Sequence, residues 1–205
     1  MDSEARDIMV EYGQFLFQRG YAVGTAGNIS LKLADGDILA TPTNACLGRL
    51  TAPALARVRL DGEQVSGEKM SKEIAFHLAL YRARPDCGAV VHLHSTYLTA
   101  LSCLENLNPE EAIKPFTPYF VMKTGRLPLI PYFRPGSPLI AEALTERLAS
   151  GSACLMANHG AVALGKTLPE AVDAFEELEE TAKLLFILGN NPVRYLTAGE
   201  VAELR

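Results

Sequence analysis

The spacing of apolar residues predicts five helices and a short sixth one. In residues 3–19, the apolar side chains of Ile8, Tyr12 and Phe15 recur at intervals of three and four residues, which places them on one helical face. Gly20 is the expected end of this helix. The other helices are predicted over residues 71–84, 95–104, 137–151 and 167–188, with a short terminal helix capped by Thr197.

Short apolar runs and glycine-containing turns predict the strands. Residues 31–40 and 58–67 each hold an Asp-Gly pair between two apolar runs, which is typical of a β-hairpin. Further strands are predicted over 89–94, 127–132, 153–157 and 161–164. Hairpins come first and helices then interleave with strands, while no repeat or linker divides the chain. We therefore expect a single α/β domain over residues 1–205, with three α/β/α layers and a mostly antiparallel central sheet.

Composition and charge narrow the class of protein. The 205 residues are 48% hydrophobic and 21% charged, which excludes a disordered chain. The formal net charge of −5 argues against a nucleic-acid partner. The N-terminus is acidic and lacks the apolar stretch of a secretory signal, and no apolar run reaches 18 residues, so we expect no membrane partner. Four widely spaced cysteines are predicted to be reduced, buried thiols, which indicates the cytoplasm.

Three of the four histidines stand in two short motifs that suit a metal. His92 and His94 end a predicted strand, and because alternate residues of a strand share a face, their imidazoles are expected to point the same way. His159 lies between Asn158 and Gly160 at a predicted tight turn. Three histidine ligands with one open position are typical of catalytic zinc. Taken alone, the first pair fits equally well with two hydrogen-bonded histidines on a half-buried strand.

Glu73 and His77 lie on the predicted helix that begins near Ser71. An acidic residue in a first helical turn is favoured by the helix dipole, so Glu73 is either a stabilising surface glutamate or a carboxylate near the metal. In the second case it serves as a fourth ligand or as an acid/base. The apolar neighbours Phe76 and Leu78 favour His77 as a core histidine outside the metal site.

Three segments rich in small and hydroxyl-bearing residues are candidates for binding a phosphate. They are the loop over residues 24–30, the loop over residues 40–44 and the helix start at Ser71 and Lys72. Loop N–H groups and a helix N-terminus donate hydrogen bonds to anions, and the lysine adds a full positive charge.

Five of these motifs follow one another in the order and spacing of one known family: Thr25-Ala26-Gly27-Asn28-Ile29-Ser30, Thr41-Pro42-Thr43, Ser71-Lys72-Glu73, Val91-His92-Leu93-His94 and Asn158-His159-Gly160. By these motifs nearly the whole chain resembles the class II aldolase/adducin family, which includes fuculose-phosphate and ribulose-phosphate enzymes. The resemblance implies an α/β/α domain that assembles into homotetramers, with each site between neighbouring subunits.

The resemblance also implies roles for the matched residues. His92, His94 and His159 are expected to ligate one Zn²⁺ per subunit. Glu73 is expected to ligate the resting metal and to act as acid/base once substrate displaces it. Tyr119 falls near the tyrosine that donates a proton in the family's aldolases. The family's phosphate-binding positions correspond to Gly27, Asn28, Thr43, Asn44, Ser71 and Lys72.

Within the family, further segments resemble the 3-oxo-tetronate 4-phosphate decarboxylases: His92-Leu93-His94-Ser95-Thr96, Lys114-Pro115-Phe116-Thr117-Pro118-Tyr119, residues 176–183 and residues 194–200. Two residues depart from the aldolase pattern, since Asn44 replaces a glycine and Lys72 replaces a serine. The implied activity is that of a carbon-carbon lyase of four-carbon sugar-acid catabolism. It would convert a β-keto sugar-acid phosphate to dihydroxyacetone phosphate and CO₂, with Glu73 or Tyr119 as the proton donor.

Four alternatives compete with this hypothesis. Within the same fold, the chain fits a class II sugar-phosphate aldolase or a dehydratase of the methylthioribulose-phosphate type. A non-catalytic interaction module like the adducin head is a third possibility, although the three histidines and Glu73 argue against it. A barrel metallohydrolase with a His-x-His pair fits least well, because such barrels need about 250 residues.

Overall fold

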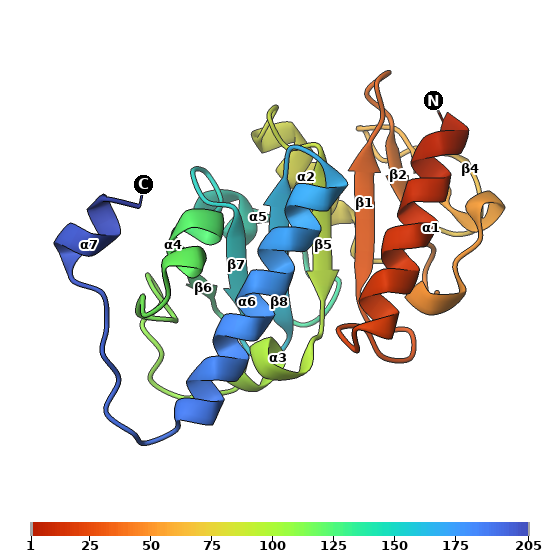
Figure 1. Cartoon of the computed structure of the whole chain (residues 1–205). Coiled ribbons are helices and arrows are strands. Elements are labelled where there is room, and N and C mark those ends of the chain that lie inside the picture. The colour runs from red at the N-terminus through yellow and green to blue at the C-terminus, as the bar shows by residue number, and fades with distance from the viewer. Residues whose placement is uncertain (1, 205) are drawn as a thin grey trace.

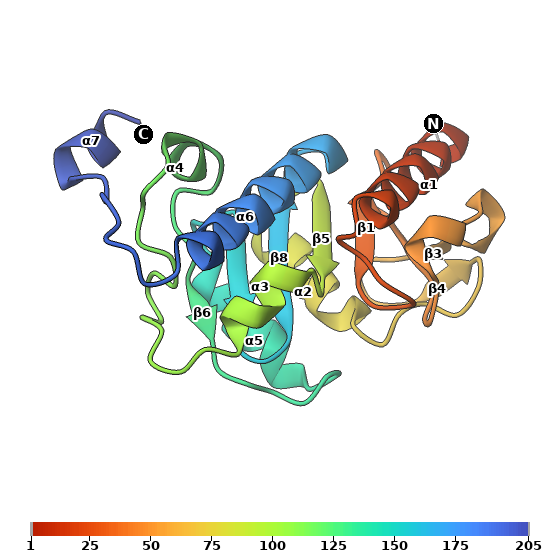
Figure 2. The ribbon, with the colours of Figure 1, turned by 60° about the horizontal axis from the view of Figure 1, so that its bottom comes forward.

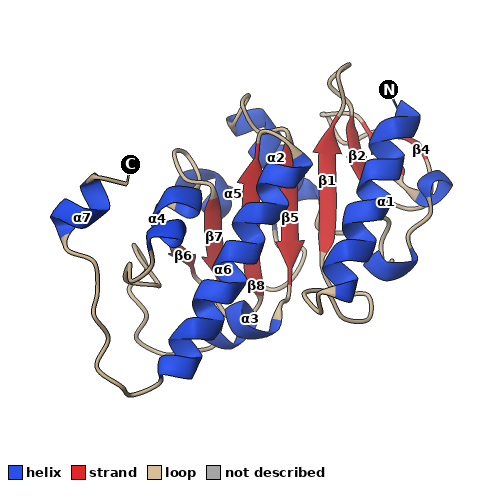
Figure 3. Ribbon diagram, in the orientation of Figure 1, coloured by secondary structure: helices blue, strands red, loops and turns tan. Residues whose placement is uncertain are grey.

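The computed structural model describes residues 2–204 and is built on an eight-stranded sheet of order β4-β3-β2-β1-β5-β8-β7-β6 (Figure 3). Residues 1 and 205, the ends of the predicted domain, lie outside the described residues. Only β6 and β7 run parallel; the other neighbouring pairs are antiparallel, as predicted. The strands are β1 (Asn28–Lys32), β2 (Ile38–Ala40), β3 (Ala56–Val58), β4 (Gln64–Ser66), β5 (Ala89–Leu93), β6 (Leu129–Ile130), β7 (Ala153–Met156) and β8 (Gly160–Gly165).

Helices cover both faces of the sheet and complete the three layers (Figures 1 and 2). Helices α1, α3, α4 and α6 pack on one face, here called the α6 face, and α2 and α5 pack on the other, the α2 face. The helices are α1 (Asp2–Gln18), α2 (Ile74–Ala83), α3 (Thr96–Ser102), α4 (Pro118–Thr124), α5 (Pro138–Arg147), α6 (Leu168–Leu188) and α7 (Ala198–Ala202), with 3₁₀ turns at Leu47–Arg49 and Ala52–Ala54. Among residues 2–204, none of these helices combines the length and the apolar character that crossing a bilayer requires.

Alternation along the central strands decides which side chains reach the α2 face. In β5, Val91 enters the core of the α6 face, whereas Val90 enters the core of the α2 face. His92 follows the same alternation as Val90 and therefore points toward α2. In β1, Asn28 and Ser30 alternate with the α6-face residue Ile29 and also point toward α2. Polar side chains of two strands thus meet one helix.

Both predicted hairpins are confirmed. Strands β1 and β2 are joined by a turn in which Leu33 N donates to Asp37 O, and strands β3 and β4 by a turn in which Arg59 N donates to Glu63 O. Gly36 turns the first hairpin with a φ of 92°. Such a conformation strains residues that carry a Cβ, so these turns favour glycine.

The helix that was predicted to begin at Ser71 begins at Ile74 instead. Glu73 is its N-cap residue, with φ −90° and ψ 0°, and makes no side-chain capping bond. Ser71, which was expected to cap this helix, lies two residues before the observed N-cap, and its Oγ accepts a hydrogen bond from Glu73 N at 3.2 Å in the turn that precedes the helix. Serine side chains commonly bond a backbone N–H two residues away in this manner. The carboxylate of Glu73 is consequently available for partners outside its helix.

Two other expectations need correction. Residues 118–124 form α4, for which no helix was predicted; Pro118 opens it and Thr117 Oγ1 accepts from Phe120 N. Cys103 is exposed, although the thiols of Cys46, Cys87 and Cys154 are buried as expected. Cys103 follows the last residue of α3, where the chain leaves the core.

Two glycines allow neighbouring segments of the backbone to approach the end of β5. A Cβ on Gly160 would lie 2.4 Å from Leu93 O, and a Cβ on Gly27 would lie 2.9 Å from His92 O. Both residues also have positive φ values, 146° and 84°. Only glycine therefore lets the starts of β1 and β8 close on the strand end that bears the histidines.

Candidate metal centre

Four side chains from three parts of the chain converge beyond the end of β5. One possible ligand atom from each of Glu73, His92, His94 and His159 lies within 4.8 Å of all the others. The ring centres of the three histidines are 4.7–4.9 Å apart in every pairing. Three imidazoles and one carboxylate in this arrangement match the donor set that zinc and related divalent metals prefer.

Each of these residues is placed by the end of an element. His92 is the fourth residue of β5 and is fully buried, and His94 follows the end of that strand. His159 sits in the β7–β8 turn, where its N–H donates to Met156 O and Asn158 adopts a φ of 56°. Glu73 comes from the opposite side, at the start of α2. A strand pair and a helix start therefore enclose the cluster.

A hydrogen bond to a backbone carbonyl fixes the orientation of the His92 ring. Its Nδ1 lies 2.9 Å from Ala161 O, and because a carbonyl can only accept, Nδ1 carries the proton. Nε2 of a neutral ring is then unprotonated and faces His94 Nε2 at 3.1 Å. A histidine ligand that donates its other N–H to a carbonyl is the usual arrangement at protein metal sites.

Burial keeps two of the clustered histidines, His92 and His94, neutral. Removal from water lowers the pKa of His92 to about 4, and burial also lowers the pKa of His94. Both imidazoles are therefore uncharged at neutral pH. Metal binding requires unprotonated histidine nitrogens, so the site needs no deprotonation of these two rings before a cation binds.

Glu73 is held in its charged form. Burial alone would raise the pKa of this carboxyl, but its contacts with His159 and His92 and a hydrogen bond from Asn28 lower it well below the ordinary value. Oε1 lies 3.4 Å from His159 Nε2, and Oε2 lies 3.5 Å from His92 Nε2. Asn28 Nδ2 donates to Oε2 at 2.7 Å. The cluster thus combines one negative charge with the neutral imidazoles of His92 and His94.

The structure brings the predicted phosphate-binding segments next to one another. Ile29 N donates to Thr41 Oγ1 at 3.2 Å, and Thr43 N donates to Lys69 O at 2.8 Å, so the first two segments are bonded to each other and the second is bonded to the chain just before Ser71. Asn44 is exposed with a φ of 57°, and Lys72 is exposed. Phosphate binding by Gly27, Asn28, Thr43, Asn44, Ser71 and Lys72 stays a prediction.

Tyr119 lies apart from this arrangement. It is the second residue of α4, which packs against α6, and 61% of its surface is exposed. Within residues 2–204, it makes no hydrogen bond to any of the four clustered side chains. Its role as a proton donor stays a prediction.

Glu179 is a residue that sequence reasoning missed. It lies on α6 and is only 3% exposed, and its carboxylate accepts from Ser95 Oγ at 2.6 Å and from the N–H groups of Tyr97 and Leu98 at 2.9 Å. The carboxylate therefore caps α3 from another helix and fixes the segment that directly follows His94. Residues 176–183 were noted only for their family resemblance; the feature that could have marked Glu179 itself is an acidic residue at a helical position that is otherwise apolar.

Replacing Glu179 with alanine is expected to destabilise the protein by roughly 3 kcal/mol, because each buried donor that loses its acceptor costs about 1–3 kcal/mol. Urea unfolding of both proteins measures the difference. Glu180→Ala, one residue further along the same helix and partly exposed, is the matched control and is expected to change stability little. Equal stabilities of the two variants would contradict this role for Glu179.

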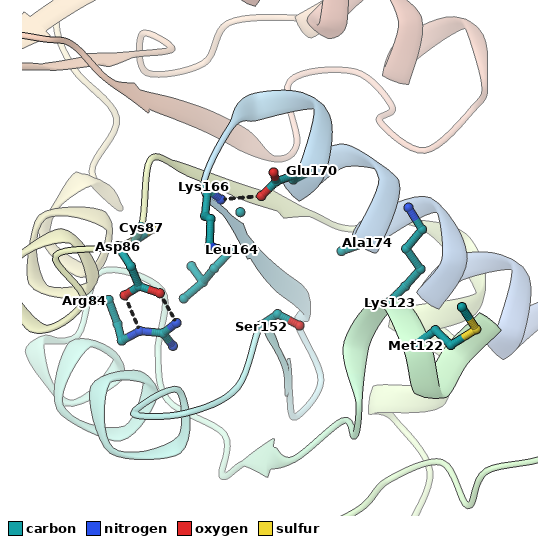
Figure 4. Close-up of a pocket in the computed structure, with 11 residues that line it drawn as sticks. Arg84, Asp86, Cys87, Met122, Lys123, Ser152, Leu164, Lys166, Glu170 and Ala174 are labelled. Carbon is teal, nitrogen blue, oxygen red and sulfur yellow. Dashed lines mark hydrogen bonds and ion pairs between the residues drawn. The ribbon is translucent and has the colours of Figure 1, made fainter. Parts of the chain in front are cut away.

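A surface cavity of about 250 Å³ lies at the opposite end of β5 and β8 from the histidines (Figure 4). Several of its charged side chains have partners: Arg84 pairs with Asp86, Lys123 pairs with Asp173, and Glu170 accepts from the backbone N–H of Lys166. The histidine cluster is therefore the better candidate for a catalytic site.

Comparison with known proteins agrees with this geometry. Residues 7–186 match the family described as the Class II Aldolase and Adducin N-terminal domain. The chain belongs to this class II aldolase/adducin family. The match includes every residue of the cluster and both glycines at the end of β5, so the local geometry and the family assignment concern the same segments.

Several members of the family are similar to this chain over nearly its full length. The 3-oxo-tetronate 4-phosphate decarboxylase of Escherichia coli (strain K12) is 58% identical over 205 residues, which is 100% of this chain and 97% of that protein. The structure of YgbL from Escherichia coli is 57% identical in sequence and superposes with a TM-score of 0.98. The match covers 100% of this chain and 99% of the YgbL chain. The L-fuculose phosphate aldolase of Methanocaldococcus jannaschii is 38% identical over 173 residues, 84% of this chain and 90% of that protein.

Proposed function

We propose that this protein is a metal-dependent lyase that converts 3-oxo-tetronate 4-phosphate to dihydroxyacetone phosphate and CO₂. The observation that carries the proposal is the 58% identity over the whole chain to a 3-oxo-tetronate 4-phosphate decarboxylase, compared with 38% over 84% of the chain to an aldolase. The Glu73 and histidine cluster supports it, because it supplies the chemistry that this reaction needs.

The substrate is a β-keto acid, and its decarboxylation leaves a negative charge that must be stabilised. The bond between the carboxylate carbon and C2 breaks, and CO₂ leaves without the bonding electron pair. That pair is shared between C2 and the ketone oxygen at C3 as an enediolate. Protonation at C2 with a proton drawn from solvent then gives dihydroxyacetone phosphate.

His92, His94, His159 and Glu73 would hold the metal, which we propose is one Zn²⁺ per subunit. The residues fit such an ion, since three imidazoles and a carboxylate converge and the His92 Nε2 is left unprotonated by the bond to Ala161 O. When bound, the metal supplies Lewis-acid stabilisation of the charge that develops on the ketone oxygen.

We assign proton delivery at C2 to Glu73, whose carboxylate lies among the histidines; it is charged in the free protein, so in this role it would first take up a proton from solvent and then pass it to C2. General acid catalysis requires the donor within hydrogen-bond reach of the reacting carbon, and Glu73 faces the only group of metal-binding side chains found among residues 2–204. Tyr119 is the second candidate. Its exposed side chain is available to a neighbouring subunit in the homotetramer that the family resemblance implies.

The surface formed by the loops after α1 and β2 and by the start of α2 would bind the phosphate. Gly27, Asn28, Thr43, Asn44, Ser71 and Lys72 are the residues proposed, and Lys72 would offset the charge of a dianion on an acidic protein. A fixed phosphate orients the breaking bond relative to Glu73 and the histidines. We also propose that the chain acts as one domain, forms a homotetramer and works in the cytoplasm.

Offering 3-oxo-erythronate and 3-oxo-threonate 4-phosphates, each made from the sugar acid by an oxidising enzyme and a kinase, tests the function directly. We expect CO₂ and dihydroxyacetone phosphate in equal amounts from at least one of the two. The same preparation is offered L-fuculose 1-phosphate, because an aldolase is the second candidate function. Aldehyde release from that substrate, with no CO₂ from either keto acid, would replace the decarboxylase with the aldolase.

A further inference from the structure

A row of buried polar side chains leads from the metal centre into the core of the α2 face. Glu73 Oε2 bonds Asn28 Nδ2 at 2.7 Å, and Asn28 Oδ1 bonds His77 Nε2 at 2.6 Å. His77 Nδ1 in turn lies 2.7 Å from Ser30 Oγ, which lies 2.9 Å from Tyr81 Oη. The last four members are 6% exposed or less, so water does not compete for these bonds.

The chemistry of these groups assigns a donor and an acceptor to each hydrogen bond in the row. A charged carboxylate can only accept, so the Asn28 amide nitrogen faces Glu73 and its oxygen accepts from His77 Nε2–H. Burial lowers the pKa of His77 to about 3, which leaves a single proton on its ring. With that proton on Nε2, Nδ1 accepts from the Ser30 hydroxyl, and Ser30 Oγ accepts from Tyr81. Every donor therefore points toward Glu73.

Packing leaves the His77 ring no alternative position. Phe76 stacks on it with ring centres 4.5 Å apart, and the same Phe76 ring meets His92 edge-on at 5.6 Å. Asn28 is paired with His92 across β1 and β5, so its backbone is fixed by the sheet. The only freedom left to the Asn28 side chain is rotation of its amide group, and His77 opposes that rotation.

We propose that His77 is a positioning residue of the metal centre: its Nε2–H locks the Asn28 amide so that Nδ2 always faces Glu73 Oε2. Ser30 is placed to donate its hydroxyl proton to Nδ1 of this tautomer, and Tyr81 to donate in turn to Ser30 Oγ. If the amide turned over, its oxygen would face the carboxylate and repel it. The inference rests on the proposed role of Glu73 at the metal, and it assigns Asn28 to Glu73 in addition to the predicted phosphate contact.

Two substitutions of similar shape separate this role from packing. In a His77→Gln variant the side-chain amide nitrogen reaches the place of Nε2 and can still donate to Asn28. In a His77→Asn variant the shorter side chain reaches only the place of Nδ1, so it keeps a bond to Ser30 and loses the bond to Asn28. Both variants retain a buried amide, which makes each the control for the other.

Zinc affinity, measured by competition with a chromophoric chelator, is the first readout. Loss of a partner that orients a metal ligand typically costs about 10–100-fold in affinity, and we expect this loss in His77→Asn with most of the affinity kept in His77→Gln. Equal affinities in the two variants would overturn the proposal. If His77→Asn does not fold, the ¹H–¹⁵N spectrum of the wild-type protein, described next, tests the proposal by itself.

The second readout needs neither metal nor substrate. Two-bond ¹H–¹⁵N spectra of metal-free protein labelled with ¹⁵N-histidine report which ring nitrogen carries the proton, and His77 is assigned by its absence from His77→Gln. We expect Nε2–H at pH 7. A proton on Nδ1 would overturn the proposal even in an active decarboxylase, whereas Nε2–H in a protein without decarboxylase activity would leave the locking of Asn28 intact and refute only the proposed function.

Discussion

Replacing His92 with alanine is expected to abolish both metal binding and CO₂ release. The imidazole is fully buried, and its ring is held by the bond from Nδ1 to Ala161 O, so no neighbouring side chain can take its place. With His92 gone, Glu73 Oε2 also loses the nitrogen 3.5 Å away. Metal content of the purified variant and CO₂ release from the keto-acid phosphates measure the two losses. His159→Ala is expected to behave in the same way.

Thermal unfolding with and without metal separates loss of the site from loss of the fold. Zinc at about 100 times its Kd stabilises a protein that binds it only when folded by about 2.7 kcal/mol. For a chain of this length that gain raises the melting temperature by roughly 5–11 °C. We expect this rise in the wild type and none in His92→Ala. Full activity in protein stripped of metal would refute the metal-dependent mechanism.

Replacing Glu73 with glutamine is expected to lower kcat by about 10²–10⁴-fold, the usual contribution of a positioned general acid or base. Glutamine has nearly the same shape and still accepts the hydrogen bond from Asn28, but it can neither carry the charge nor transfer a proton. The variant must be assayed at saturating zinc, because loss of the carboxylate also weakens metal binding.

Glu170→Gln is the matched control for this substitution. It makes the same change in charge at the start of another helix, and Glu170 is exposed near the end of β8 that lies farthest from His159. We expect Glu170→Gln to keep full activity. If Glu73→Gln retains more than a tenth of the wild-type kcat at saturating zinc, proton delivery passes to the second candidate, and Tyr119→Phe should then show the loss.

The elements that the sequence predicted well are those set by local periodicity and by turn residues. The two Asp-Gly hairpins, the strands that bear and follow the histidines, and the long helix that ends at Gly189 agree with the structure to within a few residues. The N-cap of α2 was predicted two residues too early, at Ser71 instead of Glu73, since a serine near a helix start can bond the backbone in a turn as readily as in a cap. Helix α4 was missed because residues 118–122 are an unbroken apolar run without a helical period; Tyr119 and Met122 belong to that run although they are exposed.

In the candidate site, too, local sequence features were predictable and contacts between distant residues were not. Strand alternation alone predicts that His92 and His94 point the same way, and Gly160 marks the turn that presents His159. In contrast, Asn28 meets Glu73 across 45 residues, and Glu179 meets Ser95 across 84. No local sequence pattern predicts these contacts, because they depend on how distant strands and helices become neighbours in the fold.

The sequence therefore determined the kinds of groups at the metal centre and the family to which the chain belongs, because motif order and side-chain chemistry are properties of the chain itself. Only the tertiary structure decided how those groups are held. The order β1-β5-β8 places Asn28 beside His92, and the packing of α2 on that face directs Glu73 and His77 toward the same point. His77 appeared in the sequence as an ordinary core histidine; its two hydrogen bonds, made to residues of a distant strand, give it a role at the metal centre.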